Sequence, residues 1–137
     1  MEIKNKNTVN HTIVYRDLTY KINGVLFFVH NELGRFCTEK QYGDAIEQKF
    51  KDLNIKYKRE LILPPSFCGE VRGRNKVDFL IEDKVILEIK AKSFIGREEY
   101  YQVRRYLDAI GKKLGLLINF RNKNLIIKRI LNSNANE

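Results

Sequence analysis

Apolar residues recur along this chain with two periods, one typical of helices and the other typical of strands. In residues 18–33 and 38–54 they are spaced by three and four, which predicts two helices at the start of the fold. Asp17 is a suitable N-cap for the first helix, and Thr38 with Gln41 forms a capping box for the second. The stripes predicted to face the core are Ile22, Val25, Phe28 and Leu33 in the first helix and Tyr42, Ile46, Phe50 and Leu53 in the second.

The remaining pattern consists mainly of short apolar runs bounded by turn-forming residues. Residues 66–75, rich in Gly and Arg, fit either a loop or a short strand. The segments on either side of residues 82–84 form a predicted β-hairpin. Strands are predicted at 57–63, 77–81, 85–91, 114–120 and 125–131, with a third helix at 97–112. This order predicts an α/β fold in which helices flank a central mixed sheet.

Length and composition fit one globular domain. The chain has 137 residues, of which 43% are hydrophobic and 31% charged. We expect the domain to cover residues 11–131, between a flexible N-terminal segment (1–10) and a flexible tail (132–137). No apolar run approaches the roughly 20 residues that span a bilayer, so no membrane partner is expected. The polar start lacks a signal-peptide pattern, which predicts a cytoplasmic protein.

The charge balance indicates a partner. Lys and Arg number 26 and Asp and Glu 17, which gives a net charge of +9. An excess of this size favours a polyanionic partner, and nucleic acid is the usual one. A solvated basic surface without a partner is the alternative. The two cysteines, Cys37 and Cys68, and the two histidines do not have the spacing of a zinc site.

The hairpin carries the residues with the clearest chemistry. Side chains alternate between the faces of a strand, so Glu88 and Lys90 share one face of the second strand. If residues 82–84 form the turn, Asp78 lies opposite Glu88, and both carboxylates meet on that face. A two-residue turn would shift the register by one and separate them. The three-residue turn therefore predicts a paired-carboxylate site with a lysine beside it.

Two neighbouring carboxylates repel each other, and a divalent cation between them removes that penalty. Mg²⁺ and Mn²⁺ prefer such hard oxygen ligands. On an exposed strand, Glu88 and Lys90 would be an ordinary surface ion pair. Here their neighbours are apolar, which predicts a buried strand. Charged groups in a buried strand are costly unless a partner compensates their charge. The pattern therefore favours a metal site over a surface pair.

Two helices supply further polar residues. Glu39 shares a helix face with Tyr42, so it either stabilises the positive end of the helix or points into the site. Gln102 and Tyr106 are four residues apart and share a face of the third helix. Taken alone, that pair fits the edge of any amphipathic helix.

These motifs resemble those of the PD-(D/E)XK nucleases, which have an Asp near the end of one strand and Glu/Asp-x-Lys on the next. Asp78 and the sequence Glu88-Ile89-Lys90 match that pattern, and Gln102 with Tyr106 matches the Gln-x-x-x-Tyr motif of the RecB/Cas4-like branch. The stretch from about residue 30 to 120 resembles the small GxxExxY proteins. Its matching pieces are residues 30–34, 39–42, 77–81, 87–91, 115–120 and the helix that contains Gln102. Two positions depart from the pattern, with Phe36 in place of the name-giving Gly and Val77 in place of the nominal Pro.

The resemblance implies a restriction-endonuclease-like α/β core. It implies that Asp78, Glu88 and the Ile89 carbonyl hold Mg²⁺ or Mn²⁺. It also implies Lys90 as the catalytic lysine. Glu39, Gln102 and Tyr106 would be supporting groups.

The leading hypothesis is a metal-dependent nuclease that acts on DNA through metal-activated water. The alternatives are a non-catalytic nucleic-acid-binding module and a regulatory subunit of a DNA-processing complex. A homodimer or a protein partner is compatible with the sequence. The candidates for phosphate contact, each of which also fits a solvated surface charge, are Arg72, Arg74, Lys92, Arg97, Arg104 and Arg105.

Overall fold

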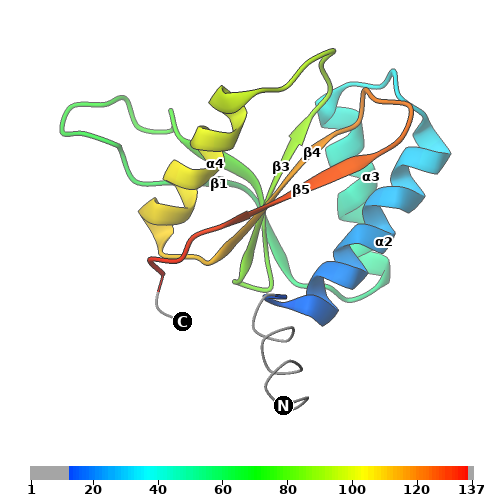
Figure 1. Ribbon diagram of the computed structural model, residues 1–137, viewed down its shortest axis with the longest axis horizontal. Helices are drawn as coiled ribbons and strands as arrows, with labels where there is room; N and C mark the ends of the chain where they lie inside the picture. Colours follow the sequence, from blue (N-terminus) through cyan, green and yellow to red (C-terminus); the bar gives the residue numbers. More distant parts are fainter. Residues whose placement is uncertain (1–12, 136–137) are drawn as a thin grey trace, which may run out of the picture.

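The computed structural model describes residues 13–135, which form three layers with helices on both faces of one sheet (Figure 1). The predicted fold class is confirmed, because the sheet is mixed and its five strands lie between helices. The predicted flexible segment 1–10 lies outside the described residues. Of the predicted tail, residues 136–137 also lie outside them, whereas Asn132 is buried and its side-chain amide donates to the Lys112 carbonyl.

Helices α2 (Arg16–Leu33) and α3 (Glu39–Asp52) cover one face of the sheet. The capping box of α3 is confirmed, since Thr38 and Gln41 exchange side-chain to backbone hydrogen bonds. The expected N-cap of α2 is wrong. Tyr15 takes that position with a left-handed backbone, and Asp17 lies within the first turn.

The apolar stripes are mostly confirmed, with two exceptions. Phe28 is 44% exposed and Leu53 is 52% exposed. In α2 the buried face consists of Ile22, Val25, Leu26 and Val29, so Val29 takes the core position that was predicted for Phe28. Leu53 follows the last residue of α3, so it no longer shares the buried face of that helix.

The sheet has the order β1-β2-β3-β4-β5, so neighbours in sequence are also neighbours in space. All neighbours are antiparallel except β3 and β4, which are parallel and joined through helix α4 (Arg97–Ile110). Gly111 ends α4 with a left-handed backbone, as its missing side chain allows. The strand bounds are β1 Tyr57–Ile62, β2 Lys76–Ile81, β3 Val85–Lys90, β4 Leu114–Asn119 and β5 Ile126–Leu131.

Residues 66–75 form a loop and no strand, which decides between the two readings of that segment. The loop projects from the β1–β2 connection on the same side of the sheet as α4 (Figure 1). Gly69 and Gly73 both have positive φ there, which a β-strand does not accommodate. The structure therefore leaves this Gly- and Arg-containing segment exposed.

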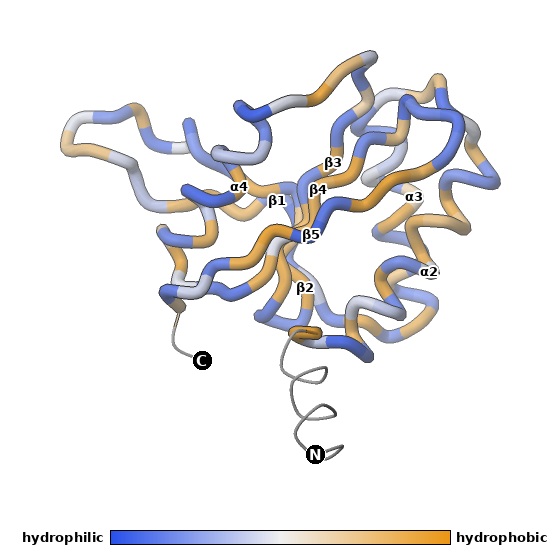
Figure 2. Tube along the Cα trace, viewed as in Figure 1, coloured by the Kyte–Doolittle hydropathy of each residue, from blue (hydrophilic) through white to orange (hydrophobic). Residues whose placement is uncertain are grey.

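Two apolar cores lie on opposite faces of the sheet. One joins α2 and α3 to side chains such as Phe79, Leu87 and Leu116. The other joins α4 to side chains such as Ile86 and Leu117. The central strands are accordingly the most hydrophobic part of the trace (Figure 2). Among the described residues, no helix has the length and hydropathy needed to cross a membrane.

Candidate active site

The candidate site begins where β2 and β3 stop pairing through their backbones. Backbone pairing of the hairpin ends at Phe79 and Leu87, which confirms the register predicted from a three-residue turn. Beyond that pair, the Asp78 N–H donates to Glu88 Oε1 at 2.9 Å. The Ile89 N–H donates to Asp78 Oδ2 at 2.7 Å. The two carboxylates are therefore fixed by the backbone of the opposite strand.

Burial makes this pair electrostatically unusual. Glu88 is only 4% exposed, and its strand neighbours are buried apolar residues. Loss of hydration, followed by the charge of Asp78, raises the pKa of Glu88 to about 8. Burial also raises the pKa of Asp78, and the hydrogen bond from the Ile89 N–H opposes that shift. The site therefore favours a proton or a cation over two bare charges.

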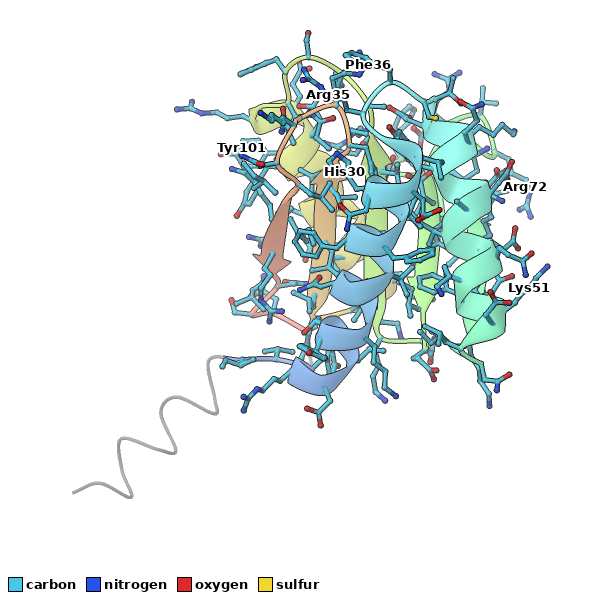
Figure 3. The ribbon with its side chains drawn as sticks, turned by 90° about the vertical axis from the view of Figure 1, so that its right-hand side faces the viewer. His30, Arg35, Phe36, Lys51, Arg72 and Tyr101 are labelled. Atoms are coloured by element: carbon cyan, nitrogen blue, oxygen red, sulfur yellow. The ribbon has the colours of Figure 1, made fainter. Side chains whose placement is uncertain are left out.

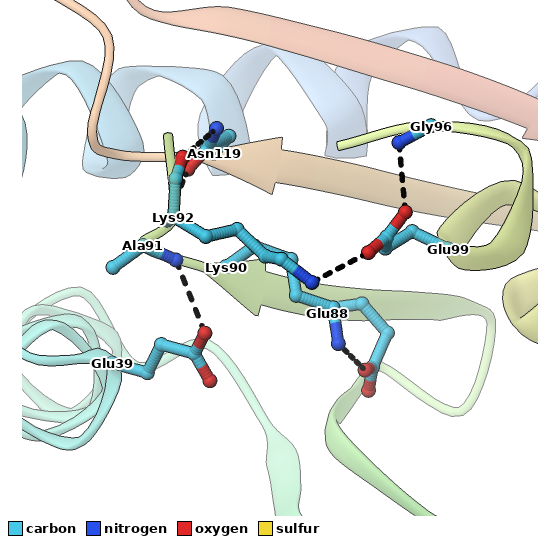
Figure 4. Close-up of polar contacts among 8 residues, drawn as sticks. All are labelled: Glu39, Glu88, Lys90, Ala91, Lys92, Gly96, Glu99 and Asn119. Carbon is cyan, nitrogen blue, oxygen red and sulfur yellow. Dashed lines mark hydrogen bonds and ion pairs between the residues drawn. The ribbon is translucent and has the colours of Figure 1, made fainter. Parts of the chain in front are cut away.

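Lys90 lies on the same strand as Glu88, at the last position of β3. Its Nζ is 4.0 Å from Glu88 Oε2, and its side chain is 19% exposed. The ammonium group therefore faces the carboxylate pair while remaining within reach of solvent. Figure 4 shows Lys90 beside Glu88, the geometry of a group that can contact a ligand bound at that carboxylate.

Glu39 approaches from the first turn of α3. Its Oε2 accepts a hydrogen bond from the Ala91 N–H at 3.1 Å, just past the end of β3 (Figure 4). Its negative charge raises the pKa values of both Asp78 and Glu88. Of the two interpretations of Glu39, its bond to Ala91 and its field at the pair favour the one that directs it toward the site.

A hollow of about 260 Å³ adjoins this acidic group, and its lining includes Glu39, Glu60 and Asp78. Glu60 was not identified from the sequence. The pairs Arg59–Phe79 and Leu61–Val77 on either side place it opposite Asp78. Its charge raises the pKa of Asp78, and its backbone has φ of 53°. The only sequence signal was its position in the strand that precedes Asp78.

The segment between β3 and α4 is tied down by polar contacts. Glu99 accepts hydrogen bonds from the Gly96 N–H and from Lys92 Nζ, both at 2.7 Å. Asn119 exchanges two side-chain hydrogen bonds with the Lys92 backbone. These contacts fix the chain that leaves Lys90 (Figure 4). Neither Glu99 nor Asn119 was identified from the sequence.

The two residues of the predicted pair on the third helix differ in their contact with the carboxylates. Tyr106 is 6% exposed, and burial followed by the charge of Glu88 raises its pKa, so its ring lies in the electrostatic range of the site. Gln102 is half-buried on the same helix and makes no hydrogen bond to the carboxylate pair.

The six candidate phosphate contacts fall into three settings. Arg72 and Arg74 are exposed on the loop 66–75, and Arg97 and Arg105 are exposed on α4. Lys92 is engaged by Glu99. The Arg104 side chain is half-buried, with its Nε enclosed and without a hydrogen-bond partner within residues 13–135.

The donor set fits a hard divalent ion that keeps part of its water shell. Asp78 and Glu88 each use one carboxylate oxygen for a backbone N–H, and the second oxygen remains for another ligand. In the part of the chain described, no three His, Cys, Asp or Glu side chains form a ready cation-binding group. Mg²⁺ commonly takes one or two carboxylates plus waters and substrate phosphates, and two neighbouring carboxylates fit that donor set.

Larger hollows lie elsewhere. One, about 680 Å³, lies at the start of α2 and near the β2–β3 turn, and neither Asp78 nor Glu88 lines it. A second, about 410 Å³, is lined by the loop after β1 and by Arg105 and Tyr106 of α4. The smaller hollow is the one of these three whose lining includes Asp78, whereas Glu88 and Lys90 do not line it.

Comparison with known proteins identifies the family. A family model described as the PD-(D/E)XK nuclease superfamily matches residues 16–130. A solved structure titled "Crystal structure of SSO0001" is similar over 67% of this chain, with 18% identity and a TM-score of 0.49. The match covers 48% of that protein, so the present chain spans about half its length. No curated protein matches the chain.

Proposed function

The chain belongs to the PD-(D/E)XK nuclease superfamily, and on that premise we propose that it is a metal-dependent nuclease that hydrolyses phosphodiester bonds in DNA. One observation carries the proposal. The buried carboxylate of Glu88 and the half-buried carboxylate of Asp78 are each fixed by a backbone N–H, and Lys90 Nζ lies 4.0 Å from Glu88. Removing two neighbouring carboxylates from water is unfavourable unless a proton or a ligand compensates their charge.

In this proposal the chain's own residues hold and orient the reactants. Asp78, Glu88 and the Ile89 carbonyl hold Mg²⁺ or Mn²⁺. Such an ion supplies Lewis acidity toward a phosphate oxygen and lowers the pKa of a bound water. Lys90 orients the attacking water or offsets the charge that develops on the phosphate.

The remaining site residues are proposed as positioning groups. Glu39 links α3 to the end of β3 through its bond to Ala91, and its charge adds to the negative field that attracts a cation. Glu60 would strengthen that field from β1. Tyr106 and Gln102 would act from α4, and the charge of Glu88 already reaches Tyr106.

The finer assignments are also proposals. Within the superfamily, the motifs that resemble those of the GxxExxY proteins and of the RecB/Cas4-like branch support a relationship to both. The net charge of +9 supports a nucleic-acid substrate. The exposed Arg72, Arg74, Arg97 and Arg105 would contact phosphates, as would Lys92 once its contact with Glu99 opens. A homodimer or protein partner and a cytoplasmic location remain predictions from the sequence.

A cleavage assay tests the proposal. Labelled single-stranded, double-stranded and branched DNA are incubated with the protein and Mg²⁺ or Mn²⁺. We expect cleavage that EDTA abolishes and that Glu88→Gln and Lys90→Ala each reduce by at least about 100-fold, as removal of one stabilising group typically does. Lys58→Ala, an exposed lysine of β1, is the matched charge control and should retain activity.

Metal titration by calorimetry makes a negative cleavage result informative. Cleavage that survives in Glu88→Gln would reject the assigned site. Metal binding without cleavage of any substrate would favour the regulatory or binding module that the sequence left as the alternative. Absence of both would reject the metal site itself.

A further inference from the structure

An exposed aromatic ring with two arginine side chains close to it lies at the same end of the sheet as the candidate active site. Phe36, in the α2–α3 loop, is 76% exposed. The Arg35 guanidinium lies 4.9 Å from the centre of its ring and that of Arg121, in the β4–β5 loop, lies 5.7 Å from it. Arg35 and Phe36 stand at the upper end of the molecule in Figure 3. These three residues are called the Arg–Phe–Arg platform below.

The two arginines are locked to each other's loop. Arg35 Nε donates to the Arg121 carbonyl, and Arg121 Nε donates to the Arg35 carbonyl, both at 2.9 Å. The guanidinium planes are thus fixed by backbone contacts. Phe36 therefore lies next to the point where the α2–α3 loop is bonded to the β4–β5 loop.

Other contacts hold the two loops in place. The Tyr42 hydroxyl donates to the Gly34 carbonyl and accepts from the Cys37 N–H. The Tyr42 ring stacks on Phe120, with centroids 4.1 Å apart. His30 Nε2 is 3.0 Å from the carbonyl oxygen of Asn122. The platform is therefore preorganised, and a ligand would not have to order it.

The charge of the platform is unpaired. Within residues 13–135, neither Arg35 nor Arg121 has a carboxylate within ion-pair distance. Each Nε is used by a carbonyl, which leaves the terminal guanidinium nitrogens for other acceptors. An exposed aromatic ring beside two guanidinium groups that have no carboxylate partner among the described residues suits a base and its flanking phosphates.

The platform adjoins the active site through the chain itself. Asn119 pairs with Lys90 in the sheet, and Arg121 follows two residues later, a chain distance of at most about 7 Å. Phe36 precedes Glu39 by three residues, and Glu39 bonds the Ala91 N–H. The α2–α3 and β4–β5 loops also lie beside each other at one end of the sheet (Figure 1).

We propose that the Arg–Phe–Arg platform binds an unpaired nucleotide of single-stranded DNA beside the Lys90 site, with the base stacked on Phe36 and phosphates on Arg35 and Arg121. The DNA assignment rests on the proposed function, whereas the stacking rests on the platform alone. Paired bases in a duplex do not present a face to Phe36, so the platform favours single-stranded over double-stranded DNA.

Binding in EDTA tests the platform without any catalytic step. Fluorescence anisotropy compares labelled dT20 with a blunt duplex of equal length at fixed salt concentration. We expect Phe36→Ala to weaken dT20 binding by about 5- to 150-fold and to affect duplex binding little. Tyr20→Ala is the matched control, because Tyr20 is 81% exposed on α2 and lies outside the platform. Equal dT20 affinity of Phe36→Ala and the wild type would overturn the proposal.

A second variant reports stacking directly. The chain has no Trp, so Phe36→Trp introduces a single indole at the platform. We expect dT20 to quench its fluorescence, and Tyr20→Trp to remain unquenched. Absence of quenching in Phe36→Trp, or quenching by rU20 without quenching by dT20, would overturn the assignment.

The two proposals fail in distinguishable ways. Cleavage lost in Glu88→Gln, together with unaltered dT20 binding by Phe36→Ala, would retain the nuclease and reject the platform. Quenching of Phe36→Trp by dT20 without cleavage of any substrate would retain the platform and reject the nuclease.

Discussion

At the scale of single residues, the carboxylate pair should destabilise the metal-free fold at high pH. The pKa of Glu88 is raised from its ordinary value to about 8, so the folded state holds this proton more tightly than the unfolded chain does. The stability that the folded state gains by holding the Glu88 proton is fully present below about pH 4.5. It is lost as pH rises through about 8.

Glu88→Gln should therefore unfold at higher temperature than the wild type at pH 9 in EDTA. The free energy of unfolding of Glu88→Gln should exceed that of the wild type by on the order of 2–5 kcal/mol at pH 9. This difference should shrink toward pH 5. Thermal unfolding across this pH range measures it, with the exposed Glu32→Gln of α2 as the control. A pH-independent difference between Glu88→Gln and the wild type would contradict the interpretation.

A divalent ion should reverse this effect. Metal bound between Asp78 and Glu88 stabilises the native state by about 2.7 kcal/mol at a hundred times its dissociation constant. We expect Mn²⁺ to raise the melting temperature of the wild type and to leave Glu88→Gln unchanged. Equal shifts in both proteins would place the ion elsewhere.

The residues of the site differ in how far the sequence determined them. Asp78 and Glu88 could be paired because strand alternation and a three-residue turn fix the register. Glu60 could not be found, because its neighbours in β1 alternate in exposure as any edge strand does, and the left-handed backbone at Glu60 leaves no sequence signal. The Arg–Phe–Arg platform joins loops about 85 residues apart, so only tertiary structure reveals it.

At the scale of elements, α4 packs so closely on β4 that a glycine is required between them. A Cβ at Gly115 would lie 2.5 Å from Val103 Cγ1. Gly115→Ala should therefore separate α4 from the sheet and destabilise the protein by about 1–3 kcal/mol. Urea unfolding measures the change.

Gly24→Ala is the matched control for that substitution. Gly24 lies inside α2, and a Cβ there meets nothing within 4 Å. The added methyl group should stabilise the helix by about 0.5–1 kcal/mol. If both substitutions destabilise equally, close packing at Gly115 is not the cause.

The first turn of α4 carries a second pH dependence. Lys92 and the Gly96 N–H lower the pKa of Glu99 to about 2, so its stabilising contacts are present above pH 4.5 and are lost as pH falls toward 2. Glu99→Gln should lower the melting temperature at pH 7, and its difference from the wild type should narrow between pH 5 and pH 3. A constant difference over that range would contradict the assignment.

The elements themselves were largely predictable, and their ends were not. Thr38 and Gln41 correctly predicted the start of α3, because a capping box depends only on four consecutive residues. The predicted N-cap of α2 was wrong because Tyr15 holds that position with a left-handed backbone, which its residue type does not favour. Residues 66–75 could be recognised as a loop only from the structure, because the positive φ values of their glycines exclude a strand and cannot be read from the sequence.

At the scale of the molecule, exposed basic groups lie apart from the acidic centre, whose carboxylates come from β2 and β3. Figure 3 shows Arg35 at the upper end of the molecule and Arg72 at its right-hand edge. Arg121 shares the end of Arg35 through their reciprocal hydrogen bonds, and Arg74 lies on the same loop as Arg72. A nucleic-acid strand would satisfy the outer cations, and the acidic centre would accept a metal ion. Under the proposed function, one part of the chain would attract the polymer and another would act on a single phosphate.

This arrangement predicts how salt weakens binding. Plots of log affinity for dT20 against log salt concentration, measured in EDTA, should have a slope that Arg72→Ala and Arg74→Ala each reduce in magnitude by about 0.7, as expected for one phosphate contact to a single strand. Lys51→Ala is the control, since Lys51 is exposed near the end of α3 and lies apart from Arg72 in Figure 3. An unchanged slope in both arginine variants would remove the loop from the binding surface. A reduced slope in Lys51→Ala would show that binding is spread over the whole positive surface instead of being directed to one face.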